Sequence, residues 1–216
     1  MALINYTRDD PRMVTSNFGL AEFQCPCGCS AQLIDDDLIR RIQTIRNKLG
    51  GKIKITSGYR CTKHNAAVRG GKVSKHLYGI AADWRMVDRS INPVALGIVA
   101  TRYFKTVGIY WYGDTAFVHT DIRNGKVTWL CTASGKYDYT SYRSFILPTI
   151  KKGCTGDVAK SATRMLQRLL GIPVDGVFGM ATENALRKAQ TSHGLTADGI
   201  CGPDSWKAIS GADKYI

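Results

Sequence analysis

The sequence of 216 residues predicts an α+β domain built on an antiparallel sheet, followed by a small helical domain. Three observations lead to this prediction: an amphipathic helix with clear end signals, a series of strand-like segments after residue 106, and an internal repeat near the C-terminus. With 44% hydrophobic and 22% charged residues the chain can bury a core. The length suits up to two domains, and we expect them at residues 1–147 and 148–216.

The first helix is expected after the acidic residues 35–37. Four apolar residues then recur on one helical face, and glycines at positions 50 and 51 end the pattern; the four are Leu38, Ile42, Ile45 and Leu49. Residues 52–56 alternate like a strand and lead into the segment 57–60, Ser-Gly-Tyr-Arg. Residues 93–104 predict a second helix, with proline in its first turn.

From residue 107 the pattern predicts a β-meander. Residues 107–112 and 115–123 are expected as strands joined by a turn at Gly113-Asp114. Asn124-Gly125 is a strong signal for a tight hairpin into a further strand over residues 126–131. The sheet of the first domain is therefore expected to be antiparallel.

The C-terminal part contains a repeat. The motif VDGVFG at residues 174–179 recurs as ADGICG at residues 197–202, and each copy precedes a helical pattern, at 181–190 and 203–209. Residues 158–170 predict a helix before them. We therefore expect a three-helix domain.

Charge and hydropathy exclude several classes of protein. No apolar run is long enough for a membrane span. The first 18 residues lack the apolar core of a secretory signal, so we expect synthesis in the cytoplasm without a signal peptide. The net charge of +13 favours a polyanionic partner, such as nucleic acid, an anionic membrane or an acidic cell-wall polymer. Charge alone does not select among them.

Histidine and carboxylate residues form two groups. His76 and Asp83 lie seven positions apart, whereas His119 and Asp121 lie two apart, on the same face of a predicted strand. Two histidines and one aspartate are a typical ligand set for catalytic zinc. With only two glutamates and no H-E-x-x-H or G-x-S-x-G motif, the chain is neither a zincin nor a serine hydrolase of the elbow type. From spacing alone, a hydrogen-bonded histidine in each segment explains the pattern equally well.

The seven cysteines include three alternate ones, Cys25, Cys27 and Cys29, in a loop with proline and glycine. They are candidates for part of a structural zinc site, with Cys61 as a fourth ligand. Their spacing differs from the usual C-x2-C, so free thiols are the alternative.

The motifs together resemble a known family. Residues 57–60 (Ser-Gly-Tyr-Arg), Asn65, the run from Ser74 through His76 to Asp83, and residues 118–121 (Val-His-Thr-Asp) are similar to the zinc D-alanyl-D-alanine carboxypeptidases. That family includes VanY-type carboxypeptidases and L-alanyl-D-glutamate endopeptidases of phage endolysins. The resemblance implies a hedgehog-like fold and a Zn²⁺ ion bound by His76, Asp83 and His119. It also implies that Arg60 grips a substrate carboxylate or carbonyl and that Ser74 contacts substrate.

One position departs from the family pattern. Many relatives carry the catalytic acid three residues before the last histidine, where this chain has Ala116. Asp121 is our candidate for the general base, and Asp114 is the alternative. Asp121 is also a candidate for orienting a ligand histidine rather than acting on water.

The repeat resembles the type 1 peptidoglycan-binding domain, through Gln167, Gln190, Trp206 and the two Asp-Gly turns. The sequence thus suggests a zinc-dependent peptidase that cleaves the stem peptide of bacterial peptidoglycan, as a monomeric phage or prophage endolysin that reaches the wall after release. We expect neither nucleic acid nor stable membrane association. The alternatives are a non-catalytic wall-binding protein with a vestigial zinc site and, on charge alone, a nucleic-acid binder.

Overall fold

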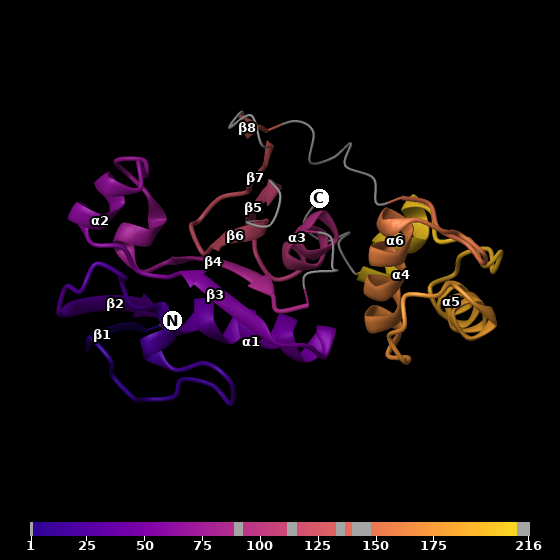
Figure 1. Cartoon of the computed structure of the whole chain (residues 1–216), viewed down its shortest axis with the longest axis horizontal. Coiled ribbons are helices and arrows are strands. Elements are labelled where there is room, and N and C mark those ends of the chain that lie inside the picture. The colour runs from indigo at the N-terminus through magenta and orange to yellow at the C-terminus, as the bar shows by residue number, and fades with distance from the viewer. Residues whose placement is uncertain (1, 89–92, 112–115, 133–136, 140–147, 211–216) are drawn as a thin grey trace.

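The computed structural model of the chain describes residues 2–88, 93–111, 116–132, 137–139 and 148–210. Figure 1 shows two groups of elements, strands with helices at one end and further helices at the other. In chain order the elements are β1 (Leu3–Thr7), the 3-10 helix η1 (Leu20–Phe23), β2 (Ala31–Asp35), α1 (Asp36–Leu49), β3 (Ile53–Ser57), α2 (Thr62–Ala67), the 3-10 helix η2 (Lys75–Tyr78), β4 (Ala81–Met86), α3 (Pro93–Thr101), β5 (Thr106–Trp111), β6 (Phe117–Asp121), β7 (Val127–Thr132), β8 (Tyr137–Asp138), α4 (Asp157–Leu170), α5 (Met180–Ser192) and α6 (Pro203–Ser210). None of the helices in these ranges has the length and apolar character needed to cross a membrane.

The main sheet is mixed rather than antiparallel, which corrects our expectation. Its strand order is β3-β4-β6-β5-β7-β8, and β5 and β7 run parallel. The segment at Asn124-Gly125 does not close a hairpin, because both edges of β6 are already paired, with β4 on one side and β5 on the other. The chain after β6 therefore crosses to the free edge of β5, where Val127 lies opposite Thr106.

Helix α1 forms where the sequence predicts it. The Asp35 carboxylate caps the helix by accepting from the backbone N–H of Asp37 at 2.9 Å, and Gly50 ends it with a φ of 61°. Its apolar residues are buried in one core with the inner face of the sheet, including Trp84, Val118 and Ile109. On the opposite helix face, Arg40 and Arg41 pair with acidic residues one turn earlier.

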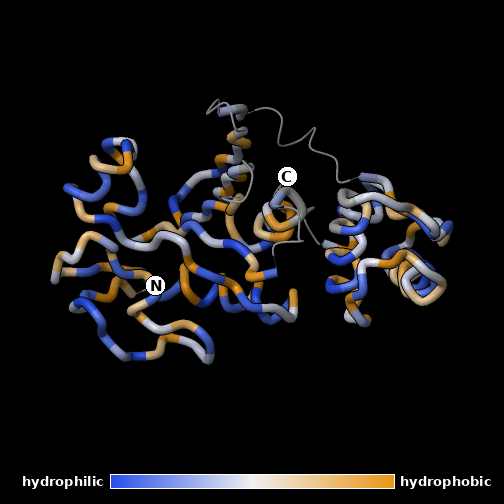
Figure 2. Tube along the Cα trace, viewed as in Figure 1, coloured by the Kyte–Doolittle hydropathy of each residue, from blue (hydrophilic) through white to orange (hydrophobic). Residues whose placement is uncertain are grey.

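Helix α3 is apolar nearly throughout, as the orange tube in Figure 2 shows. Such a helix belongs inside a protein, and Leu96, Val99 and Ala100 are indeed buried in the same core. Gly97 permits close packing on the sheet, since a Cβ there would lie 2.5 Å from the Ile109 side chain. With α1 and α3 covering one face, the other face of the sheet is left for a cavity.

In the C-terminal part, a buried glutamine holds each copy of the repeat. The Gln167 side chain donates to Asp175, the Val177 carbonyl and Thr182, and accepts from the N–H groups of residues 175 and 176. Gln190 makes the corresponding bonds in the second copy: it donates to Asp198, the Ile200 carbonyl and Ser205, and accepts from the Gly199 N–H. The repeat therefore encodes two equivalent turns, each fixed by the helix before it.

Contacts support the expected boundary near residue 148, which stays a prediction. Trp206 donates from Nε1 to the Pro148 carbonyl at 3.1 Å, and Ile150 pairs with Cys201, so residues 148 and 150 already contact the C-terminal part. Two arginines on α4 make polar contacts with the first part: Arg168 reaches Asp88 at 2.9 Å and the Leu49 carbonyl at 3.2 Å, and Arg164 lies 3.9 Å from the Asp88 carboxylate.

We predict that Gln190→Leu lowers the free energy of unfolding by about 2–3 kcal/mol, because the volume is kept while several buried partners lose their hydrogen bonds. Asn184→Leu, an exposed polar-to-leucine change on the same helix, is the matched control and should stay within about 0.5 kcal/mol. Urea unfolding followed by circular dichroism measures both. Equal effects of the two variants would contradict the role given to Gln190.

Candidate metal centre

The candidate site lies on one row across five strands. Ser57 on β3 pairs with Asp83 on β4, Asp83 pairs with His119 on β6, His119 with Gly108 on β5, and Gly108 with Trp129 on β7. Residues at paired positions point to the same face of a sheet. The pairing thus brings together residues that are up to 72 positions apart in the sequence.

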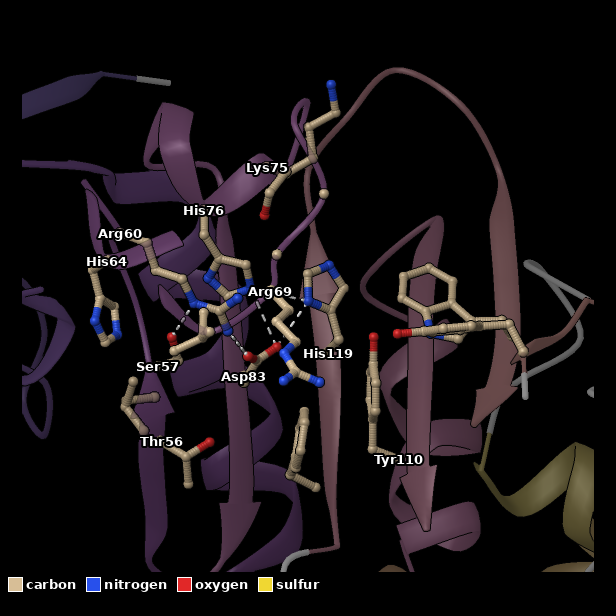
Figure 3. Close-up of a pocket in the computed structure, with 18 of the residues that line it drawn as sticks. Thr56, Ser57, Arg60, His64, Arg69, Lys75, His76, Asp83, Tyr110 and His119 are labelled. Carbon is tan, nitrogen blue, oxygen red and sulfur yellow. Dashed lines mark hydrogen bonds and ion pairs between the residues drawn. The ribbon is translucent and has the colours of Figure 1, made fainter. Parts of the chain in front are cut away.

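Three buried side chains meet on this row and the adjacent 3-10 helix η2. Asp83 Oδ1 lies 2.8 Å from His119 Nδ1 and 3.3 Å from His76 Nε2, and the two imidazole nitrogens are 3.2 Å apart. Their residues are only 5%, 7% and 2% exposed, for Asp83, His119 and His76. Figure 3 shows the three pointing toward one another. The sequence-predicted trio is therefore assembled.

In each histidine, one ring nitrogen faces Asp83 and the other is held by a hydrogen-bond partner on the opposite side of the ring. His76 Nδ1 lies 2.6 Å from the Gly58 carbonyl, which only accepts, so this nitrogen carries the proton and Nε2 has a free lone pair. His119 Nε2 lies 3.1 Å from the Asp121 carboxylate, so a proton held there would let Nδ1, which faces Asp83, bind a metal ion. Ligand histidines of metal sites are usually held in this manner. The donor set fits a zinc ion with three protein ligands, and the trio is a candidate metal group.

When no metal is bound, the pKa shifts favour the charged forms of Asp83 and His119. Burial raises the pKa of Asp83, but the neighbouring His76 and His119 outweigh it and hold that pKa well below its usual range. Burial lowers the pKa of His119, and the bonds to Asp121 and Asp83 outweigh it and raise it. A bound divalent cation replaces such a proton, because metal ligands must be deprotonated.

Asp121 lies behind His119 rather than beside the cavity. It is 0% exposed and does not line the cavity described below. The Arg123 guanidinium binds it with Nε at 2.8 Å and 2.9 Å from its two oxygens, and Nη2 makes a further bond. Burial raises the pKa of Asp121, but the bonds from His119 and Arg123 lower it to about 2. This position suits the orienting role that the sequence left open beside the general-base role.

Arg60 also contacts the ligand group. Its Nε donates to Ser57 Oγ at 2.7 Å, and its Nη2 makes an ion pair with Asp83 Oδ2. Among the described residues, Nη1 has no recorded hydrogen-bond partner, and the side chain lines the cavity. Arg60 thus holds the outer oxygen of Asp83 while one of its nitrogens stays available.

An open cavity of about 970 Å³ lies over the trio. Ser74, expected from the sequence as a substrate contact, lines this cavity. Among the described residues, the lining contains one carboxylate, Asp83, and several cationic side chains, namely Lys54, Arg60, Arg69, Lys75, Arg85 and Arg123. The cavity is therefore suited to an anionic ligand.

The sequence did not identify several lining residues. His64, whose sequence context suggests only a surface or capping residue, lines the cavity from α2. Aromatic residues also line it: Tyr110, Phe117, Trp129, Tyr137 and Tyr139. Trp129 packs 5.2 Å from the His119 ring, over Gly108, where a Cβ would lie 2.3 Å from the indole. The pairing of Gly108 with Trp129 could have identified this aromatic contact. The sequence alone does not show that β5 and β7 are neighbours, so the signal could not be used.

Two positions near the start of β6 bear on the catalytic acid. Ala116, half-buried just before β6, offers no carboxylate. Asp114 lies outside the described residues.

Comparison with known families gives two matches. Residues 16–121 match the model of the Peptidase M15 family, and residues 155–209 match the model of a peptidoglycan binding domain. The first segment contains all three members of the candidate metal centre, and the second contains α4, α5 and α6 almost entirely. No curated protein was found to match the chain.

We predict that His76→Ala binds one zinc per chain fewer than the unchanged protein after dialysis, since two remaining ligands hold zinc poorly. The control is His193→Ala, at an exposed position after α5, which should keep its full zinc content. Elemental analysis of both proteins is the measurement. Equal zinc content would show that the trio does not bind zinc.

Proposed function

We propose that this chain, which combines a Peptidase M15 domain with a peptidoglycan-binding domain, is a zinc-dependent peptidase that cleaves the stem peptide of bacterial peptidoglycan. The observation that carries the proposal is the buried His76–Asp83–His119 group at the base of a basic cavity. We further propose the hedgehog-like fold for the first part, action as a monomer without nucleic acid, and the role of a phage or prophage endolysin.

The chemistry would depend on a zinc ion held by His76, Asp83 and His119. When bound, zinc supplies an acidified water and a Lewis acid for a peptide carbonyl. The Gly58 carbonyl and the Asp121 carboxylate keep the two imidazoles in the tautomers that this binding needs. Arg60 keeps the outer oxygen of Asp83 in place.

The substrate class follows from the charge of the cavity. The stem peptide of peptidoglycan carries free carboxylates, and the part of the lining that the structure describes presents six lysine or arginine side chains against the single carboxylate of Asp83. We propose that Arg60 Nη1 binds a substrate carboxylate or carbonyl, since guanidinium suits planar oxygen groups, and that Ser74 contacts the same peptide. The net charge of +13 and the second domain would hold the enzyme on an anionic wall.

Two bonds fit this proposal equally. One is the L-alanyl-D-glutamate linkage cut by an endopeptidase, and the other is the terminal D-alanyl-D-alanine bond cut by a carboxypeptidase. The cavity is open rather than closed around one residue, which accommodates an internal bond as well as a chain end.

A second candidate function is a wall-binding protein without catalysis. The observation that favours it is Ala116, which stands where many relatives carry the catalytic acid. Such a protein would bind peptidoglycan through residues 155–209 and leave it intact.

Digestion of purified Gram-positive sacculi separates the two functions. We expect new peptide ends that vanish with a chelator, return with added zinc, and are absent with the His119→Ala variant. Mass spectrometry identifies the bond, because an endopeptidase creates a new amino terminus at D-glutamate and a carboxypeptidase releases D-alanine. Sacculi that bind the protein but stay intact with zinc present would reject catalysis in favour of wall binding.

For Asp121 we propose that it positions His119 rather than taking the proton from water. Asp121→Asn should then weaken zinc affinity by about 10- to 100-fold, while kcat recovers when zinc is saturating. Competition with a zinc chelator and kcat at excess zinc are the two measurements. Unchanged affinity with kcat lost at saturating zinc would instead identify Asp121 as the general base. Asp88→Asn, a carboxylate paired with Arg168, is the control.

A further inference from the structure

A second group of potential metal ligands lies outside the centre described above. Cys25, Cys27 and Cys29 lie in the loop between η1 and β2, and Cys61 stands directly before α2. The four Sγ atoms all lie within 4.8 Å of one another, although Cys61 is 32 positions away from Cys29. We propose that these four thiolates bind one structural zinc ion.

The sulfur separations match a zinc tetrahedron more closely than a pair of disulfides. Cys27 Sγ lies 3.3 Å from Cys25 Sγ and 3.3 Å from Cys61 Sγ, whereas a disulfide needs about 2.05 Å. Zinc with four sulfurs at about 2.3 Å spaces those sulfurs about 3.8 Å apart. The two short separations fall below that value, and all four sulfurs lie within 4.8 Å of one another, so they are close enough to surround one ion. A closed set of four thiolates is also typical of structural rather than catalytic zinc.

Two backbone N–H groups point at sulfur atoms of the group. The N–H of Cys61 points to Cys25 Sγ at 3.5 Å, and the N–H of His64 points to Cys61 Sγ at 3.4 Å. Backbone N–H groups directed at sulfur are a general way to orient metal ligands. Gly28, between two of the cysteines, has a φ of 87°, which lets the loop turn back so that Cys29 rejoins the group.

Gln32 on β2 fixes the shape of the loop. It is 3% exposed, its Oε1 accepts from the Cys25 N–H at 2.7 Å, and its Nε2 donates to the Cys29 carbonyl at 2.5 Å. Both ends of the three-cysteine segment are thereby held by one buried amide. The side chains of the loop are preorganised before any ion binds, which favours tight binding.

The four cysteines lie next to residues that shape the His76–Asp83–His119 centre, so zinc bound by them would also affect that centre. Cys61 follows Arg60, whose backbone N–H donates to the His76 carbonyl. Tyr59 donates to the Phe23 carbonyl at 2.7 Å, and Gly58 packs so closely on Phe23 that a Cβ would lie 2.3 Å from that carbonyl oxygen. A zinc ion would therefore pin the N-terminal loop to the segment that carries Arg60 and the Gly58 carbonyl, which holds His76.

The test must separate this ion from one bound by the histidines. The double variant His76→Ala/His119→Ala removes two ligands of the first centre and leaves all the cysteines. Purified with a thiol reductant, it should retain one zinc per chain by native mass spectrometry. X-ray absorption should report sulfur ligands at about 2.3 Å rather than nitrogen or oxygen at about 2.0–2.1 Å. Three results would overturn the proposal: the absence of zinc, zinc bound by nitrogen or oxygen ligands, or a disulfide among these cysteines in the reduced preparation.

Single-cysteine variants give a second test in the otherwise unchanged chain. Cys61→Ser should lose one zinc per chain and lower Tm by more than about 5 °C, since an ion that binds only the folded state stabilises it. Cys154→Ser, a half-buried cysteine outside the group, is the matched control and should keep its zinc. Equal zinc content in the two variants would contradict the proposal. If Cys61→Ser does not fold, the double histidine variant decides alone, because its cysteines are intact.

These results are distinguishable from a failure of the proposed function. Zinc held by sulfur in the double histidine variant supports the cysteine site whether or not the unchanged protein cleaves peptidoglycan. Zinc found only on the histidines rejects the cysteine site and leaves the peptidase proposal standing.

Discussion

The burial of Asp83 between two imidazoles is the constraint on which the site depends. A carboxylate taken out of water costs several kcal/mol unless opposite charge surrounds it, and Asp83 is only 5% exposed. His76, His119 and Arg60 all contact its oxygens. A divalent cation at the two inner nitrogens would supply that charge more fully than a shared proton, and the outer partners of both histidines already hold those nitrogens ready.

The sheet makes this arrangement specific. Because β6 is paired on both edges, His119 lies directly between Asp83 and Gly108, and a shift of one residue would turn its side chain into the hydrophobic core. The apolar face packs on α1 and α3, which fixes the register. Packing on one face thus determines the chemistry on the other, and the cysteine group anchors the loop that supplies Arg60 and Gly58.

The sequence predicted local features better than pairings. Helix α1, the glutamine-linked repeat and the trio of His76, Asp83 and His119 were identified, because each depends on short-range patterns or on a family motif. The hairpin at Asn124-Gly125 was wrong, since a turn signal does not reveal that β6 has no free edge. The contacts of Arg60 with Asp83, and of Asp121 with Arg123, depend on tertiary distances. The aromatic lining depends on the crossover that places β7 beside β5.

The most direct test of the central claim is a crystal structure with anomalous diffraction data on both sides of the zinc absorption edge. The account predicts an anomalous peak bounded by His76 Nε2, Asp83 Oδ1 and His119 Nδ1, with Asp121 still on His119 Nε2. If crystals grown with zinc show these three side chains well ordered but no anomalous peak between them, the result contradicts the account. The trio would then be a hydrogen-bonded charge cluster rather than a metal centre.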